Sequence, residues 1–114
     1  MYTIYHNPRC SKSRQTLAIM NENNVDVKII KYLTDPPTAE ELEDISGKLA
    51  ISPMDFIRKK ESVFTDLGLK SYNGSDSELC EIMNKNPKLI ERPIVIKGDR
   101  AIMGRPPENV LELF

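Results

Sequence analysis

The stretch that decides the fold is YTIYHNPRCSKSRQTLAIMNENNVDVKIIKY, residues 2–32. Residues 2–6 alternate aromatic and β-branched side chains and predict a short strand, which Asn7-Pro8 ends. The apolar spacing is helical from residue 11 to about residue 23, and residues 25–32 are again rich in valine and isoleucine. A strand, a helix and a second strand in this order predict a crossover between parallel strands.

Helical patterns fill the middle of the chain, after the stop at Asp35-Pro36-Pro37. Capping patterns at Thr38 and Ser75 predict two helix starts. The pair Ser52-Pro53 predicts a third, since serine is a good N-cap and proline is favoured at the first helical position. We therefore expect helices over about residues 38–90.

Strand patterns return near the end of the chain. Residues 93–97 predict a strand, Gly98-Asp99 a hairpin turn, and residues 100–103 the partner strand. Pro106-Pro107 then predicts the start of a last helix. The order βαβ…ββα is that of an α/β thioredoxin-like fold with a helical insertion between its halves. At 114 residues, the chain is expected to form one domain, 1–114.

Composition and charge exclude several classes of protein. Apolar residues make up 39% and charged residues 29%, which is typical of a folded globular protein. The sequence contains no apolar run of membrane-spanning length and does not start like a signal peptide, so we expect a cytoplasmic protein without membrane contact. Sixteen basic side chains against seventeen acidic ones give a net charge of −1, which argues against a nucleic-acid partner.

The cysteine and histidine counts limit metal and disulfide chemistry. The chain has two cysteines, Cys10 and Cys80, and one histidine, His6. Because these residues are few and mostly far apart in sequence, no metal site is expected. In a reducing cytoplasm, a Cys10–Cys80 disulfide is not expected either.

Cys10 lies where the first strand is predicted to end and the first helix to begin. The free N–H groups and positive dipole of a helix start stabilise a thiolate and can also hold a tetrahedral oxyanion. Arg9, Lys12 and Arg14 add positive charge nearby in sequence, and His6 is a candidate proton partner. The alternative is an inert cysteine that packs at a strand–helix junction.

Ser13 decides which thiol chemistry is open to Cys10. The motif is Cys10-Ser11-Lys12-Ser13, so the second cysteine of a Cys-x-x-Cys pair is absent. A serine hydroxyl can donate a hydrogen bond to the Cys10 thiolate, but it cannot resolve a disulfide. The sequence therefore predicts a nucleophile that an external thiol must regenerate.

Three arginines from separate segments are candidates for binding an oxyanion: Arg58, Arg92 and Arg105. A guanidinium group grips a tetrahedral oxyanion through paired hydrogen bonds, which lysine cannot reproduce. The alternative is that these arginines are ordinary surface charges.

The runs YHNPRCSKS, FIRKKE, ERPIVI and GRPPENVLELF resemble the glutaredoxin-dependent arsenate reductases over essentially the whole chain. The resemblance implies that Cys10 is the nucleophile. It also implies residues that tune the thiolate, His6 and Ser13, and arginines that bind the oxyanion, Arg58, Arg92 and Arg105. A cis peptide bond before Pro93 is a further implication.

The reaction that this resemblance implies is the reduction of arsenate to arsenite. The Cys10 thiolate attacks arsenate, glutathione adds next, and glutaredoxin provides the second thiol. Arsenate, glutathione and glutaredoxin are thus the expected partners. Both thiols act as external reductants, with no bound cofactor and no metal, and the protein is expected to be a monomer.

Two other functions stay open at this point. A thiol-stress transcription regulator of the same fold would bind RNA polymerase, although such regulators typically carry Cys-x-x-Cys and lack the arginine at the position of Arg105. A generic monothiol glutaredoxin-like transferase would act on glutathione mixed disulfides. Cys80 is expected to pack half-buried on a helix flank, the alternative being a resolving or redox-sensing thiol.

Overall fold

The structure, a computed structural model, describes residues 1–114, and the chain forms two compact units. Unit 1 consists of two segments, Met1–Asp35 and Arg92–Phe114, and unit 2 is the continuous segment Pro36–Glu91. The helical insertion that the sequence predicts over about residues 38–90 corresponds to unit 2. That the two units form a single domain stays a prediction.

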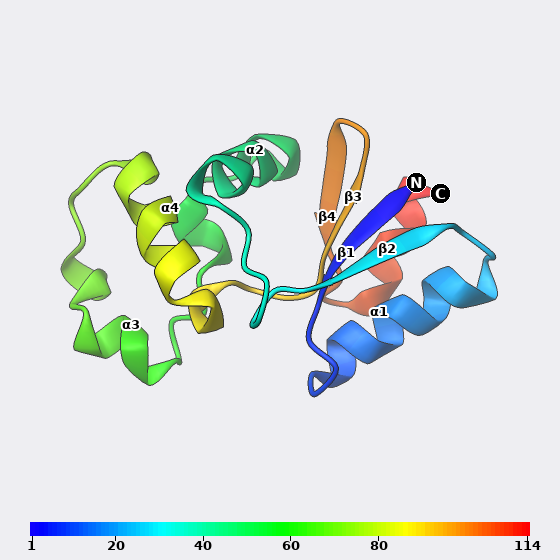
Figure 1. Cartoon of the computed structure of the whole chain (residues 1–114), viewed down its shortest axis with the longest axis horizontal. Helices are drawn as coiled ribbons and strands as arrows, with labels where there is room; N and C mark the ends of the chain where they lie inside the picture. Colours follow the sequence, from blue (N-terminus) through cyan, green and yellow to red (C-terminus); the bar gives the residue numbers. More distant parts are fainter. The chain divides into compact units, whose positions relative to one another are not determined.

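Unit 1 contains the sheet (Figure 1). Its strands are β1 (Tyr2–His6), β2 (Val27–Lys31), β3 (Ile94–Lys97) and β4 (Arg100–Met103). The strand order is β2-β1-β3-β4, in which β1 is parallel to β2 and antiparallel to β3. Helix α1 (Ser11–Glu22) connects the parallel pair, since such a pair needs a crossover. This mixed sheet with its helices is the α/β thioredoxin-like fold that the sequence predicts.

The core of unit 1 lies between the sheet, α1 and the C-terminal helix η4 (Pro107–Leu113). Its fully or nearly fully buried side chains are Ile4, Met20, Val95, Val110 and Leu113. Burying a side chain of this size contributes about 1.5–3 kcal/mol to folding. The last helix, η4, is a 3₁₀ helix along its whole length.

The two ends of the chain are held together in unit 1 (Figure 1). The Tyr2 hydroxyl donates a hydrogen bond to the carbonyl oxygen of Leu113 at 3.1 Å. The Tyr2 ring also packs edge-on against Phe114, with 5.8 Å between the ring centroids. The first strand and the last helix are therefore fixed to one another.

Unit 2 is entirely helical apart from its connecting segments and one isolated β-bridge. Its helices are α2 (Ala39–Leu49), η1 (Pro53–Phe56), α3 (Ser62–Asp66), η2 (Leu69–Ser71), α4 (Asp76–Lys85) and η3 (Pro87–Leu89). The predicted capping box at Thr38 is confirmed: its hydroxyl accepts from the Glu41 N–H at 3.1 Å, and the Glu41 carboxylate accepts from the Thr38 N–H at 3.0 Å. Ser75 caps α4 in the same sense, by accepting from the Glu78 N–H.

The helix predicted from Ser52-Pro53 is only one 3₁₀ turn, η1. Beyond it, Ile57 forms an isolated β-bridge with Ile90. The flanking backbone bonds, Arg58 N–H to Leu89 at 2.7 Å and Glu91 N–H to Phe56 at 2.9 Å, hold this segment extended. Pairing with a distant segment therefore overrides the local helix signal.

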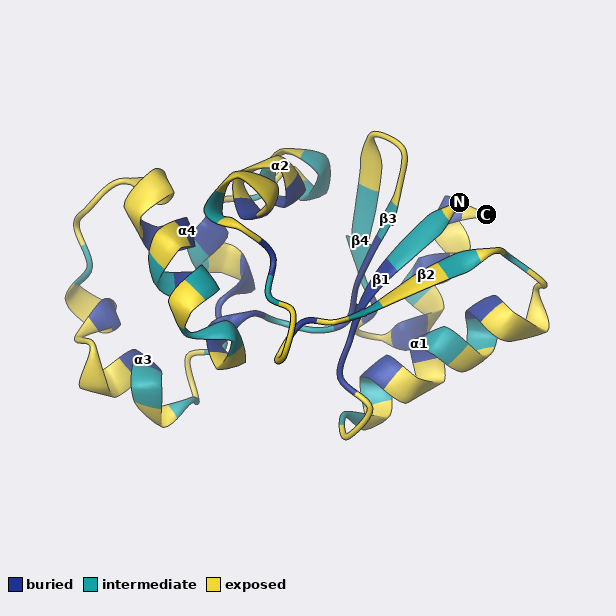
Figure 2. Cartoon of the chain, viewed as in Figure 1, coloured by how far each residue is buried: buried dark blue, intermediate teal, exposed yellow.

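Helices α2 and α4 pack against one another in the core of unit 2. Figure 2 shows the buried side of each helix in dark blue. The fully or almost fully buried side chains of these two helices are Leu42, Ile45, Leu79, Cys80 and Met83. None of the helices in the structure is long and apolar enough to cross a membrane.

Candidate active site at Cys10

Cys10 is the N-cap residue of α1, the position that the sequence predicts for it. Its N–H donates to the carbonyl oxygen of Asn7 at 3.0 Å, which closes the turn between β1 and the helix. Its own carbonyl oxygen accepts from the Arg14 N–H at 3.0 Å, the first helical bond of α1. The thiol is partly exposed. It therefore stands at a helix N-terminus and remains accessible to a small reactant.

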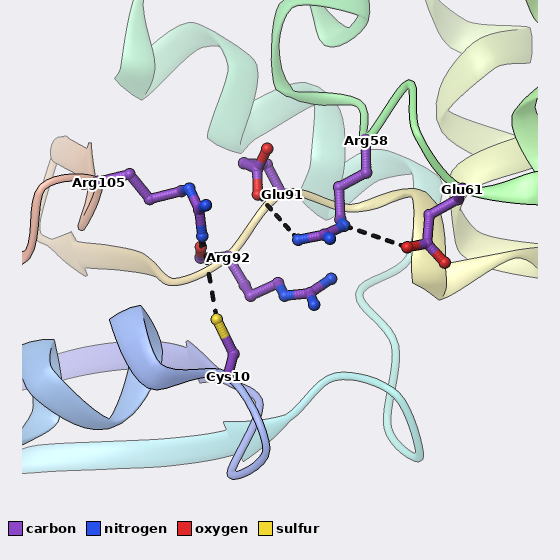
Figure 3. Close-up of polar contacts among 6 residues, drawn as sticks. All are labelled: Cys10, Arg58, Glu61, Glu91, Arg92 and Arg105. Carbon is purple, nitrogen blue, oxygen red and sulfur yellow. Dashed lines mark hydrogen bonds and ion pairs between the residues drawn. The ribbon is translucent and has the colours of Figure 1, made fainter.

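Two of the three predicted arginines lie beside Cys10 in unit 1 (Figure 3). The Nη1 atom of Arg105 is 3.9 Å from the Cys10 Sγ atom. The same Nη1 atom donates to the carbonyl oxygen of Arg92 at 3.3 Å. Arg92 lies two residues before β3 and Arg105 two residues after β4, so the β3–β4 hairpin brings both to α1.

The pKa of the Cys10 thiol is lowered from its ordinary value. Burial is the largest single influence and raises the pKa, but several donors together outweigh it. These are the N–H groups of Ser13 and Lys12 at the start of α1 and the Arg92 guanidinium, which acts through a hydrogen bond and its charge. The helix start and an arginine thus favour the thiolate.

The Ser13 side chain is hydrogen-bonded within the turn that carries Cys10. Its oxygen is 2.6 Å from the His6 Nδ1 atom and accepts from the Asn7 N–H at 3.1 Å. The backbone N–H of Ser13 also helps to lower the pKa of the Cys10 thiol. That the Ser13 hydroxyl donates to the Cys10 thiolate stays a prediction.

His6 is buried at the end of β1. Burial lowers its pKa, and the nearby charges of Lys31 and Arg14 lower it further. The lowered pKa favours the neutral ring at pH 7, and its Nδ1 atom is hydrogen-bonded to the Ser13 hydroxyl. In this state His6 supports the turn that carries Cys10 rather than adding positive charge to the site.

Arg58 belongs to unit 2, where it is paired with two carboxylates (Figure 3). Its Nε atom is 3.4 Å from Glu61, and its Nη1 atom is 3.4 Å from Glu91. Glu61 is close to Arg58 in sequence, whereas the β-bridge between Ile57 and Ile90 brings the distant Glu91 to Arg58. That Arg58 binds the same oxyanion as Arg92 and Arg105 stays a prediction.

The expected half-buried position of Cys80 is wrong. Its side chain is completely buried in α4. Burial raises the pKa of the Cys80 thiol to about 11, and the carboxylates of Glu43 and Asp76 add to the effect. The helix α2, which packs on α4, covers the flank that the sequence pattern left open.

The peptide bond between Arg92 and Pro93 is cis, as the resemblance implies. The bond between Arg105 and Pro106 is also cis, which the sequence analysis does not anticipate. Both arginines near Cys10 thus directly precede a cis proline.

Unit 2 has a groove of about 670 Å³ that does not contain any predicted site residue. Its lining is Met54, Lys59, Phe64, Thr65, Gly68, Leu69, Lys70 and Tyr72. These side chains include neither a cysteine nor a carboxylate. Volume alone therefore does not locate the chemistry of this protein.

A thioredoxin-like sheet with one accessible thiol at the start of its first helix defines a single-thiol protein of that fold class. Within this class, the chain belongs to the ArsC family, which it matches over residues 5–113.

Relatives in this family match the chain over nearly its whole length. It is 43% identical over 112 residues to "Arsenate reductase" of Haemophilus influenzae, covering 97% of each chain. It is 45% identical over 111 residues to "Uncharacterized protein YfgD" of Escherichia coli, covering 96% of this chain and 93% of that protein. The solved structure of "Arsenate reductase from Vibrio cholerae" superposes with a TM-score of 0.95 at 43% identity, over 99% of this chain and 97% of that one.

Proposed function

We propose that the protein reduces arsenate to arsenite, with Cys10 as the nucleophile and with glutathione and glutaredoxin as external reductants. The observation that carries the proposal is the Arg105 guanidinium 3.9 Å from the Cys10 sulfur, at a helix N-terminus that favours the thiolate. A neutral disulfide substrate would have no need of this positive charge. The arsenate reductases among the relatives support arsenate as the oxyanion.

In the first step the Cys10 thiolate attacks the arsenic atom of arsenate. A sulfur–arsenic bond forms, an arsenic–oxygen bond breaks, and the oxygen leaves as water or hydroxide. Arg105 and Arg92 lie where they can hold the remaining arsenate oxygens through charge-assisted hydrogen bonds. The N–H groups at the start of α1 serve the same anion.

Reduction then needs two thiols from outside the chain. Position 13 is a serine, so no second sulfur lies on the first turn of α1. The Ser13 hydroxyl is hydrogen-bonded to His6. Glutathione displaces a second oxygen from arsenic, and the glutaredoxin thiolate then attacks the glutathione sulfur. The two electrons of that sulfur–arsenic bond stay on arsenic, and a glutathionyl–glutaredoxin disulfide forms. Water then attacks the arsenic(III) that is still bonded to Cys10, the sulfur–arsenic bond breaks with its electron pair returning to the Cys10 thiolate, and arsenite leaves.

The test is arsenite formation by the purified protein with arsenate, glutathione and glutaredoxin, with each component omitted in turn. The proposal expects arsenite only in the complete mixture. Formation without glutaredoxin would change the assigned reductant, and no formation in any mixture would overturn the proposal. Two parallel assays, reduction of a glutathione mixed disulfide and binding to RNA polymerase, measure the alternative functions directly.

A further inference from the structure

Gly104 lies against α1 more closely than any residue with a side chain could. It is buried, and its backbone does not have the positive φ that would by itself demand glycine. A Cβ atom placed on it would overlap the Thr16 hydroxyl and would lie 2.7 Å from the Pro93 Cγ atom. Real Cβ contacts do not come this close, so position 104 requires glycine for space.

Hydrogen bonds hold Gly104 on both of its sides. Its N–H donates to the carbonyl oxygen of Pro93 at 2.9 Å. Its carbonyl oxygen lies 3.4 Å from the Thr16 hydroxyl, which is fully buried and also lies 2.8 Å from the carbonyl oxygen of Lys12. The single hydroxyl hydrogen is shared between the two carbonyl oxygens. Thr16 thus connects the first turns of α1 to the segment after β4.

The chain position of Gly104 links this contact to the candidate active site. Gly104 immediately precedes Arg105, Pro93 immediately follows Arg92, and Thr16 lies on the helix that Cys10 caps. One buried contact therefore joins the three segments that carry the thiol and its two arginines. The 3.9 Å between Arg105 Nη1 and Cys10 Sγ is already long for a hydrogen bond, so a small displacement of this segment would break it.

We propose that Gly104 and Thr16 are positioning residues that set the distance between the Arg105 guanidinium and Cys10. Gly104 does so by its lack of a side chain, and Thr16 by its hydroxyl. Neither touches the reacting atoms. The inference rests on the proposed function only in taking arsenate as the anion that Arg105 holds.

Gly104→Ala is the main test, with Gly47→Ala as a matched control. Gly47 lies in α2, and a Cβ there would meet no atom within 4 Å. The measurement is the rate of Cys10 alkylation by iodoacetamide in Cys80→Ser protein, with and without added arsenate. We expect Gly104→Ala to raise the arsenate concentration for half protection roughly 30- to 150-fold, the same effect that we expect from the loss of Arg105. Gly47→Ala should match the parent protein.

The same variants in an Arg105→Gln background separate positioning from general damage. In the Arg105→Gln background only the position of Arg92 remains to be disturbed, so Gly104→Ala should change protection by less than about 3-fold. A full additional loss in that background would overturn the proposal. Protection of the Gly104→Ala protein equal to that of the parent would overturn it as well.

Thr16 provides a second measurement, which also decides the matter if Gly104→Ala does not fold. Thr16→Val keeps the shape but loses the hydroxyl, and we expect about 3- to 10-fold weaker protection. Thr16→Ser keeps the hydroxyl, so arsenate should protect its Cys10 as well as it protects the parent protein. Equal protection of the Thr16→Val and Thr16→Ser proteins would overturn the role of Thr16.

Alkylation without arsenate keeps this inference separate from the proposed function. At pH 6 the loss of Arg105 should slow alkylation of the thiol, and Gly104→Ala should reproduce that change. If the parent protein is not protected by arsenate and forms no arsenite, the proposed function fails, but this comparison still tests the positioning.

Discussion

The two cysteines occupy opposite kinds of helical site. Cys10 caps the N-terminus of α1, is partly exposed, and has N–H groups and arginine side chains around its sulfur. Cys80 lies inside α4, is completely buried, and has the carboxylates of Glu43 and Asp76 nearby. The pKa of the first thiol is lowered, and that of the second is raised to about 11.

Because the residue type is the same, the difference in pKa comes from the surroundings: burial and two carboxylates act on Cys80, whereas the N–H groups of a helix start and the Arg92 guanidinium act on Cys10. A helix start offers free N–H groups to an anion, whereas the middle of a helix has already used them. The carboxylates next to Cys80 then oppose the thiolate further.

The largest expected effect is the loss of Cys10 itself. Cys10→Ser replaces the thiolate by a hydroxyl that does not ionise at neutral pH, so arsenite formation should fall by about 10³-fold or more. Cys80→Ser is the matched control and should keep the parent rate once its fold has been verified by circular dichroism. A large loss of rate in the control would contradict the contrast between the two thiols.

The next effect is the difference in alkylation rate between the two thiols. With a pKa of about 11, Cys80 has roughly one thiolate in 10⁴ at pH 7, and burial also blocks the reagent. We therefore expect Cys10 to react at least about 100-fold faster at pH 7. The measurement compares Cys80→Ser with Cys10→Ser protein across a pH series, and faster reaction of Cys80 at pH 6–7 would reverse the assignment.

Exchange of the arginines for lysine should have an intermediate effect. Arg105→Lys and Arg92→Lys keep the charge but lose the planar fork, so kcat/KM for arsenate should fall roughly 30- to 150-fold. Arg58→Lys examines the third arginine that the family resemblance implies. Arg100→Lys is the control, because Arg100 is not a predicted site residue and its guanidinium donates to the carbonyl oxygen of Glu112. Near-normal rates in all three site variants would show that no arginine site for arsenate exists.

The smallest expected effect is on stability and concerns His6, the only histidine of the chain. Its pKa is lowered in the folded state, mainly by burial, so below pH 6.5 the unfolded chain binds more protons. Unfolding free energy should therefore fall as the pH drops from 7.5 to 5.5, by up to about 1.4 kcal/mol per unit below pH 6.5. Urea denaturation of the parent and of the His6→Gln protein across this pH range measures the unfolding free energy. An equal change of that free energy with pH in both proteins would refute the prediction.

Much of unit 1 could be predicted because its signals are local. The alternation in residues 2–6 and the turn residues Gly98-Asp99 specify strands and a hairpin without reference to distant parts of the chain. Gly98 has the positive φ of 61° that glycine adopts most readily. Cys10 was placed at a helix start for the same reason, since the strand, the break and the helical pattern are consecutive.

The rest depends on contacts between distant residues, which a single sequence does not display. Periodicity placed Cys80 on a helix flank but could not indicate that α2 covers that flank. The hydrogen bond between the Ser13 hydroxyl and His6 forms because the buried end of β1 brings His6 to α1, which spacing alone does not indicate. Gly104 gave no signal at all, because its requirement for space arises only when Thr16 and Pro93 pack around it.

The discontinuity of unit 1 has a consequence for the order of folding during synthesis. Unit 2 is one continuous segment and can form as soon as Glu91 has emerged from the ribosome. The central strand β1 is translated before unit 2, but its antiparallel partner β3 is translated after it. We expect one edge of β1 to stay unpaired until β3 has emerged. The sheet that carries Cys10 would then be completed after unit 2.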